Sequence, residues 1–367
     1  ASGGNYNVTV GDEAGTALTT GDNNVAIGYA AFDSATDQQD NVAIGYNALT
    51  AITASGGTLC TAVGSKALEA NTAGYHNTAV GYGAQDANTH GIRNVSMGRD
   101  SLGADTKGSY NTAIGDVALA TQNFTTATDV YNTAVGASAG TSITTGVGNT
   151  LLGGLAGDAL TDADFNVAIG KNTLSTDTLG SFNTAVGINA LETQNFTTAT
   201  NAYNTAIGAL AGGAVTTGVN NVLIGALAGD ALTDADLNVA VGKGALTTDT
   251  LGSKSVAIGF AALEAQNFTT ATDSHNTAVG NAAGAAVTVG KFNTLVGSLT
   301  GDAITTGENN SALGCDALST NVHGDNVVAI GNEAAQLLNP TASSGTDTHM
   351  NGVYIGYQAG DEVTTGR

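Results

Sequence analysis

Apolar residues recur in this chain at a short, regular interval, in the pattern Asn-x-Ala-(Val/Ile)-Gly. Twenty glycines close a copy of the pattern, and neighbouring copies are 17 residues apart in fourteen of nineteen intervals. The other five intervals are longer, at 19, 21, 21, 21 and 25 residues, as expected where loops lengthen on a constant coil. Such a period is typical of solenoids, in which each repeat packs only on its neighbours. The anchor glycines are Gly11, Gly28, Gly45, Gly64, Gly81, Gly98, Gly115, Gly136, Gly153, Gly170, Gly187, Gly208, Gly225, Gly242, Gly259, Gly280, Gly297, Gly314, Gly331 and Gly356.

The residues around each anchor glycine predict the elements of one coil. The residue before the glycine is always apolar, and Ala stands three residues after it in 17 of 20 copies. Residues 111–114 (Asn-Thr-Ala-Ile) alternate and include β-branched side chains, which predicts a short strand. Residues 117–119 predict a second short strand, and a Thr-Thr-Gly turn often follows, as at 144–146. We expect such coils to stack so that equivalent residues lie on one another.

Asn stands four residues before the anchor glycine in 16 of 20 copies. In a stack of coils this column is expected to form a ladder of side-chain amides that satisfies backbone groups of the turns. The sequence therefore predicts an all-β fold, a parallel β-solenoid of about 20 coils of 17 residues, in one continuous repeat domain over residues 1–367. Because the chain begins and ends inside the pattern, we expect it to be a piece of a longer protein.

A longer period of 72 residues lies on top of the short one. Residues 111–182 are closely repeated as 183–254 and more loosely as 255–326, which indicates duplication of a four-coil block. Each block carries the same insert, Gln-Asn-Phe-Thr-Thr-Ala-Thr, at residues 122–128, 194–200 and 266–272. We expect the inserts to project from the coils at regular steps and to be the first place to look for receptor contact.

Composition excludes several classes of partner. The chain carries 31 acidic and 9 basic residues, for a net charge of −22, so it lacks the basic footprint that nucleic acid or an anionic membrane surface requires. There is no run of about 18 apolar residues that would span a membrane. Ala, Thr, Asn and Gly fill most positions, which predicts a thin core of small side chains.

No combination of residues predicts catalysis, a cofactor or a metal. The histidines His76, His90, His275, His323 and His349 are scattered, without metal-ligand spacing. Residues 153–157 (Gly-Gly-Leu-Ala-Gly) lack the Lys-Ser/Thr of a phosphate-binding loop, so structural glycines are expected there. We therefore expect a protein that is not an enzyme.

Several features have two interpretations. The acidic turn with Asp158, Asp162 and Asp164, repeated at Asp230, Asp234 and Asp236, is either a solvated turn or a Ca²⁺ site. Asn-Phe-Thr at residues 123–125, 195–197 and 267–269 is either duplicated loop sequence or a glycosylation site. The Thr column three residues before the anchor is either a structural ladder or an ice-binding array. Cys60 and Cys315 are too far apart in the repeat to pair within one chain, and we expect two free buried thiols, with pairing between copies as the alternative.

The coil resembles the head repeats of trimeric autotransporter adhesins of the YadA-like type. Residues 255–259 (Ser-Val-Ala-Ile-Gly) fit the family's strand directly, and residues 41–45 and 166–170 are equally close. Similar repeats are familiar in tail-fibre-like proteins of bacteriophages. The resemblance implies a left-handed β-roll, three identical chains around one axis, and a role in attachment. The 17-residue coil and the inserts depart from the adhesin heads and tilt the interpretation towards a phage fibre.

Three functional hypotheses follow from these observations. The first is an extracellular homotrimeric fibre segment, on a virion or a cell, that attaches to a host receptor or glycan through its loops. The second is a single-chain solenoid that binds ice, calcium or polysaccharide. The third is a subunit of a polymeric extracellular filament. Small side chains in the core columns favour the first, because three chains together bury more apolar area than one.

Overall fold

The computed structural model describes residues 4–55, 58–338 and 350–364, and these contain β-strands and turns and no helix. The chain forms two compact units, of which unit 1 comprises Ala1–Phe182 with Thr197–Thr200 and unit 2 comprises Asn183–Phe196 with Asn201–Arg367. Each unit contains ten three-residue strands, and every one of them ends at the residue before an anchor glycine. The predicted all-β solenoid of 17-residue coils is therefore confirmed.

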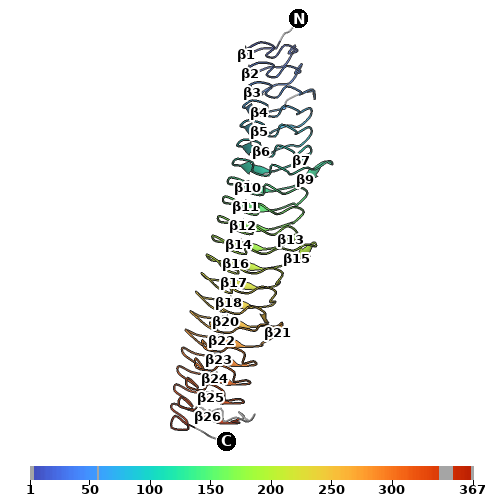
Figure 1. Cartoon of the computed structure of the whole chain (residues 1–367). Helices are drawn as coiled ribbons and strands as arrows, with labels where there is room; N and C mark the ends of the chain where they lie inside the picture. The colour runs from blue at the N-terminus through green and yellow to red at the C-terminus, as the bar shows by residue number, and fades with distance from the viewer. Residues whose placement is uncertain (1–3, 56–57, 339–349, 365–367) are drawn as a thin grey trace. The chain divides into compact units, whose positions relative to one another are not determined.

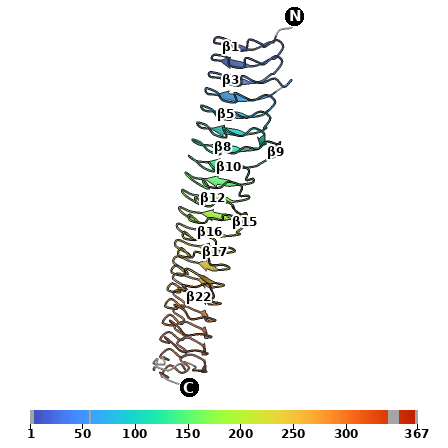
Figure 2. The ribbon, with the colours of Figure 1, turned by 45° about the vertical axis from the view of Figure 1, so that its right-hand side comes forward.

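The strands of unit 1 follow one another in chain order, one strand per coil (Figure 1), and a second view shows the same order (Figure 2). They pair in parallel and in register, so that Ala43 lies opposite Ala62 and Ile44 opposite Val63. The strands are β1 (Val8–Val10), β2 (Val25–Ile27), β3 (Val42–Ile44), β4 (Thr61–Val63), β5 (Thr78–Val80), β6 (Val95–Met97), β8 (Thr112–Ile114), β10 (Thr133–Val135), β11 (Thr150–Leu152) and β12 (Val167–Ile169).

Unit 2 repeats this arrangement, with parallel pairing of each strand to the next, as between Ala240 and Ala257. Its strands are β14 (Thr184–Val186), β16 (Thr205–Ile207), β17 (Val222–Ile224), β18 (Val239–Val241), β20 (Val256–Ile258), β22 (Thr277–Val279), β23 (Thr294–Val296), β24 (Ser311–Leu313), β25 (Val328–Ile330) and β26 (Val353–Ile355). Six two-residue strands lie near the inserts: β7 (Gly108–Ser109), β9 (Thr128–Asp129), β13 (Gly180–Ser181), β15 (Thr200–Asn201), β19 (Gly252–Ser253) and β21 (Thr272–Asp273).

The anchor glycines adopt a backbone conformation that only glycine tolerates. Gly115 has a φ of +139°, and a Cβ on it would lie 2.3 Å from the carbonyl oxygen of Gly136 in the next coil. Gly136 stands in the same relation to Gly153, at 2.4 Å. The glycine column thus meets two requirements at once, a φ unavailable to side-chain-bearing residues and close approach of adjacent backbones.

The prediction of a second strand at residues 117–119 is wrong, because this part of the coil is a wide turn. Val117 and Leu119 have φ values of +50° and +51°, in the left-handed region, which a strand cannot contain. Their amides point to opposite neighbours: Val117 N donates to Arg99 O at 2.9 Å and Leu119 N donates to Ala139 O at 3.1 Å. Hydrogen bonds to both adjacent coils thus hold a conformation that is unfavourable for an isolated residue.

The predicted amide ladder is present. Asn149 N donates to Asn132 Oδ1 at 2.8 Å, and Asn166 N donates to Asn149 Oδ1 at 2.9 Å. In each rung the side-chain Nδ2 also reaches a turn carbonyl, as from Asn149 to Ala163 O at 2.8 Å. These side chains are fully buried, so each one satisfies backbone groups that water cannot reach.

The core contains larger side chains than the composition suggested. The middle residue of each strand points inward and is usually Ala, and it faces a column of buried Leu residues four positions after the anchor glycine, such as Leu119 and Leu174. Where this second column carries Gly instead, the strand supplies the volume. A Cβ on Gly140 would lie 2.7 Å from Cδ1 of Leu151, and a Cβ on Gly157 would lie 2.8 Å from its Cδ2. Leu223 and Leu295 stand in the same relation to their neighbouring glycines, 72 and 144 residues later.

A further inward column, seven residues after the anchor glycine, changes between apolar and polar coils. Ile143 and Leu160 are buried there in consecutive coils, whereas Asp105 and Gln122 occupy the preceding two. Gln122 Nε2 donates to Asp105 Oδ2 at 2.6 Å, so the polar coils satisfy one another. The sequence analysis missed this column, although its alternation is visible once the repeats are aligned.

Candidate functional site

The inserts are held at their base and exposed at their tip. In the first insert Gln122 is fully buried and Phe124 is 8% exposed, whereas residues 125–127 are exposed. Figure 1 shows the adjoining pair of β7 and β9 projecting from the coils, on the side away from the column of three-residue strands. The expected projection is therefore observed, with only a Thr-Thr-Ala tip available for contact.

A buried carboxylate braces each of two inserts from the preceding coil. Asp105 Oδ1 accepts hydrogen bonds from Gly108 N at 3.0 Å and from Phe124 N at 3.1 Å. Burial raises the pKa of Asp105, and these hydrogen bonds oppose that increase. Asp249 makes the same contacts with Gly252 N and Phe268 N, each at 3.0 Å. These acids hold the loop in place and are not open to a ligand.

The Asn-Phe-Thr segments place their Asn at the loop surface. Asn123 is exposed, its Oδ1 accepts a hydrogen bond from Thr106 Oγ1 at 3.1 Å, and its backbone N donates to Thr144 O at 2.9 Å. Phe124 between Asn123 and Thr125 is buried, so the segment is docked on the coil. Glycosylation of these residues stays a hypothesis.

The acidic turns use their carboxylates on the preceding coil. Asp162 accepts from Thr145 Oγ1 at 2.6 Å, and Asp164 accepts from Val147 N at 2.8 Å. Burial raises the pKa of Asp158. In unit 2, Asp234 and Asp236 repeat the two contacts at the same distances. Within the described residues no group of three or more His, Cys, Asp and Glu side chains is arranged to hold a metal ion.

The described histidines lie in separate coils. His76 and His90 are exposed in turns, His275 stacks on Phe292 with ring centroids 5.4 Å apart, and His323 Nδ1 lies 2.9 Å from Thr306 Oγ1. His349 lies outside the described residues. The structure therefore brings none of the four described histidines next to another.

Both cysteines are free, as expected, but only Cys60 is buried. Burial raises the pKa of the Cys60 thiol to about 11, so it stays protonated at neutral pH. Cys315 is exposed, and the expectation of a buried thiol there is wrong. It stands one residue after an anchor glycine, in a column that lies at the surface, and its thiol contacts Asp316 Oδ2 at 3.3 Å.

Residues 153–157 are structural, as expected from their lack of a Lys-Ser/Thr pair. Gly153 is an anchor glycine with a φ of +141°, and Gly157 leaves room for the side chains of Leu151 and Leu160. Both positions are explained by packing between coils.

The strands present a partly apolar outer face. Their first and third residues point outward while the middle residue is buried, and the third is Val, Ile, Leu or Met throughout. Met97 in unit 1 is 44% exposed and Leu313 in unit 2 is 50% exposed. The Thr column lies on the same face, with Thr112, Thr133 and Thr150 in consecutive coils. This outer strand face is a regular surface that could contact another copy or a ligand.

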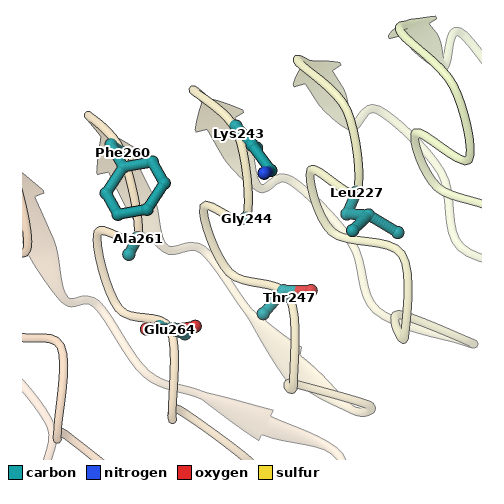
Figure 3. Close-up of a pocket in the computed structure, with 7 residues that line it drawn as sticks. All are labelled: Leu227, Lys243, Gly244, Thr247, Phe260, Ala261 and Glu264. Carbon is teal, nitrogen blue, oxygen red and sulfur yellow. The ribbon is translucent and has the colours of Figure 1, made fainter.

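Unit 2 also contains a pocket formed by three consecutive coils (Figure 3). Its volume is about 220 Å³, and Gly244 lies at its centre. The remaining lining residues are Leu227, Lys243, Thr247, Phe260, Ala261 and Glu264. The sequence analysis did not identify this pocket, because its residues are spread over 38 positions and match no motif.

The fold and these surfaces define a parallel β-solenoid that offers repeated outer faces and short loops. Comparison with known proteins found no family model and no curated protein that matches the chain. Among the described residues no helix is long and apolar enough to cross a membrane. Functional assignment therefore depends on the chemistry of the surfaces themselves.

Proposed function

We propose that the chain is a non-enzymatic, structural segment of an extracellular fibre, in which three copies associate and the projecting inserts contact a host or other surface. The observation that carries this proposal is the outer strand face, which repeats one apolar column in every coil of each unit. Contiguous exposed apolar surface of this kind marks interaction sites. The resemblance of the coil to adhesin heads and phage tail fibres supports the same function.

Association of copies would remove this apolar column from water. Side chains such as Ile258 and Ile330 are 38% and 37% exposed, and they recur at every coil. Each 100 Å² of such surface that is buried contributes about 2.5 kcal/mol. A modest contribution per coil therefore becomes large when the whole face is covered.

The absence of enzymatic function is supported by the state of the chemical groups. The described histidines lie apart, and Cys60, with its pKa raised to about 11, has no thiolate at neutral pH. The buried acid Asp105 is occupied by loop amides. These groups serve structural roles in which they are already satisfied.

A second candidate is a solenoid that is stable as a single chain, alone or as a filament subunit, and binds ice, calcium or polysaccharide. The inward Leu and Ile columns favour it, because such a core buries apolar area without a partner. The Thr residues of the outer strand face would then be a ligand surface, interrupted by Val95 and Val167.

The absolute mass in solution distinguishes the two candidates. Light scattering on a size-exclusion column should give about three times the chain mass of 35.9 kDa for the fibre. The double variant Val135→Glu, Leu152→Glu places two charges on the outer strand face and should give the mass of one chain. Thr126→Glu, on an exposed insert tip, is the matched control and should leave the mass unchanged. A wild-type chain that elutes as a monomer would refute the trimer and favour the single-chain solenoid.

A further inference from the structure

The pocket in unit 2 exists because one column of side chains is interrupted. Gly244 stands two residues after its anchor glycine, at a φ of +66°, and a Cβ built on it meets no atom within 4 Å. The neighbouring coils place Leu227 and Ala261 at the equivalent positions, on either side of the gap (Figure 3). Any side chain at residue 244 would therefore project into the open space.

Charged groups of both signs line this space without neutralising each other. Lys243 and Glu264 come from adjacent coils, and within the described part of the chain neither takes part in an ion pair. By contrast, Lys66, Arg99, Lys254 and Lys291 all pair with carboxylates. In a chain of net charge −22, a lysine that lines a pocket with no carboxylate within 4.0 Å is available for an anionic group.

Apolar walls complete the pocket. The ring of Phe260 is 57% exposed and faces the gap over Gly244 from one side, with Leu227 on the other (Figure 3). Thr247 lies at the lower edge of the view, and its hydroxyl donates to Asp230 in the preceding coil, so its oxygen can still accept a hydrogen bond. The lining therefore combines a cation, a carboxylate, an acceptor and two apolar surfaces.

The duplicated blocks show which changes create the pocket. The preceding block has Asn172, Ile188 and Asn189 where the pocket has Gly244, Phe260 and Ala261. Leu, Lys and Glu occur in both blocks, at residues 155, 171 and 192 and again at 227, 243 and 264. Two of the three changes remove side-chain volume, and the third supplies an aromatic ring. The constellation therefore occurs in one of the three blocks.

We propose that this pocket binds a small zwitterion with an apolar body, the chemical class of free α-amino acids with apolar side chains. The ligand's carboxylate pairs with Lys243, its ammonium pairs with Glu264, and its apolar part lies between Phe260 and Leu227. A ligand with one charge would leave the other protein charge desolvated and unpaired, which is unfavourable. This inference does not depend on the oligomeric state of the chain.

Saturation-transfer NMR on the full chain tests the proposal with three probes of one shape: leucine, leucinamide and 4-methylpentanoate. We expect saturable binding of leucine with a Kd on the order of 1 mM, as for a shallow site and a small ligand. Leucinamide lacks the carboxylate and 4-methylpentanoate lacks the ammonium, so each should bind at least tenfold more weakly. Absence of saturable leucine binding would overturn the proposal, and equal binding of all three probes would overturn the zwitterion class.

Variants locate the binding to this pocket. Gly244→Asn introduces the residue that the preceding block carries at Asn172, where φ is +54°, so the fold should be retained while the space is filled. Gly244→Asn, Lys243→Met and Glu264→Gln should each weaken leucine binding at least tenfold. Lys171→Met removes the equivalent lysine of the preceding block and is the matched control, with no expected change. Unchanged binding to Gly244→Asn would show that the leucine site lies elsewhere and would refute the assignment.

Discussion

Replacing Gly153 with alanine tests whether the anchor glycines set the spacing of the coils. A Cβ on Gly153, at its φ of +141°, would lie 2.4 Å from the carbonyl oxygen of Gly170 and 2.6 Å from its carbonyl carbon. Real Cβ atoms do not approach backbone atoms so closely, so the two coils must separate locally. The neighbouring residue provides a matched control, because a Cβ on Gly154 has only Ala137 O within 4 Å, at 3.9 Å.

The structure sets the size of the effect. A non-glycine residue in this backbone region costs about 1–3 kcal/mol, and forcing extra volume between packed coils costs about 1–3 kcal/mol more. Gly153→Ala should therefore destabilise its coil by about 2–6 kcal/mol. Gly154→Ala should be neutral or stabilise the coil by up to about 1 kcal/mol, because it restricts the unfolded chain. Ala137 already occupies the equivalent position one coil earlier.

Amide hydrogen exchange measures this effect where it acts, since a repeat protein need not unfold in one step. Gly170 N donates to Leu152 O at 2.8 Å across the perturbed coils. Its protection should fall about thirtyfold or more in Gly153→Ala and stay within about threefold of wild type in Gly154→Ala. Equal loss of protection in both variants, or unchanged protection in Gly153→Ala, would refute the steric role assigned to the anchor glycines.

Three other predictions concern the interior of unit 1. Leu151→Ala should cost about 3 kcal/mol in urea denaturation because it leaves a cavity, and adding Gly140→Leu should recover part of that loss; no coupling between the two changes would contradict their shared space. Asn132→Ala removes the acceptor of Asn149 N and should cost about 1–3 kcal/mol, seen as faster exchange of that amide, whereas unchanged exchange would argue against the ladder. Because burial raises the pKa of Asp105 above 3.8, the folded chain binds this proton more tightly than the unfolded chain, and its contribution to stability falls as pH rises through that window. Asp105→Asn should therefore gain in Tm relative to wild type as pH rises from 3.8 towards the raised pKa, and a constant difference in Tm would contradict this assignment.

The repeat made much of the fold predictable. The positions of the strands, their register and the amide ladder follow from the spacing of the anchor glycines, because equivalent residues of stacked coils must coincide. The inserts were recognised as loops, since they add residues to a period that is otherwise constant. Their bases at Gln122 and Phe124 were not expected to be buried, because polar and loop residues give no local signal of burial.

The sequence by itself determined the class of fold, the coil length and the surfaces that repeat. Tertiary structure decided the conformation of Val117 and Leu119, because their left-handed φ values are held by hydrogen bonds from neighbouring coils and not by local preference. It also decided how Leu151 replaces volume absent at Gly140, a contact between residues of adjacent coils. The pocket around Gly244 belongs to the same category: three coils form it, so its charges and apolar walls meet only when the chain has folded.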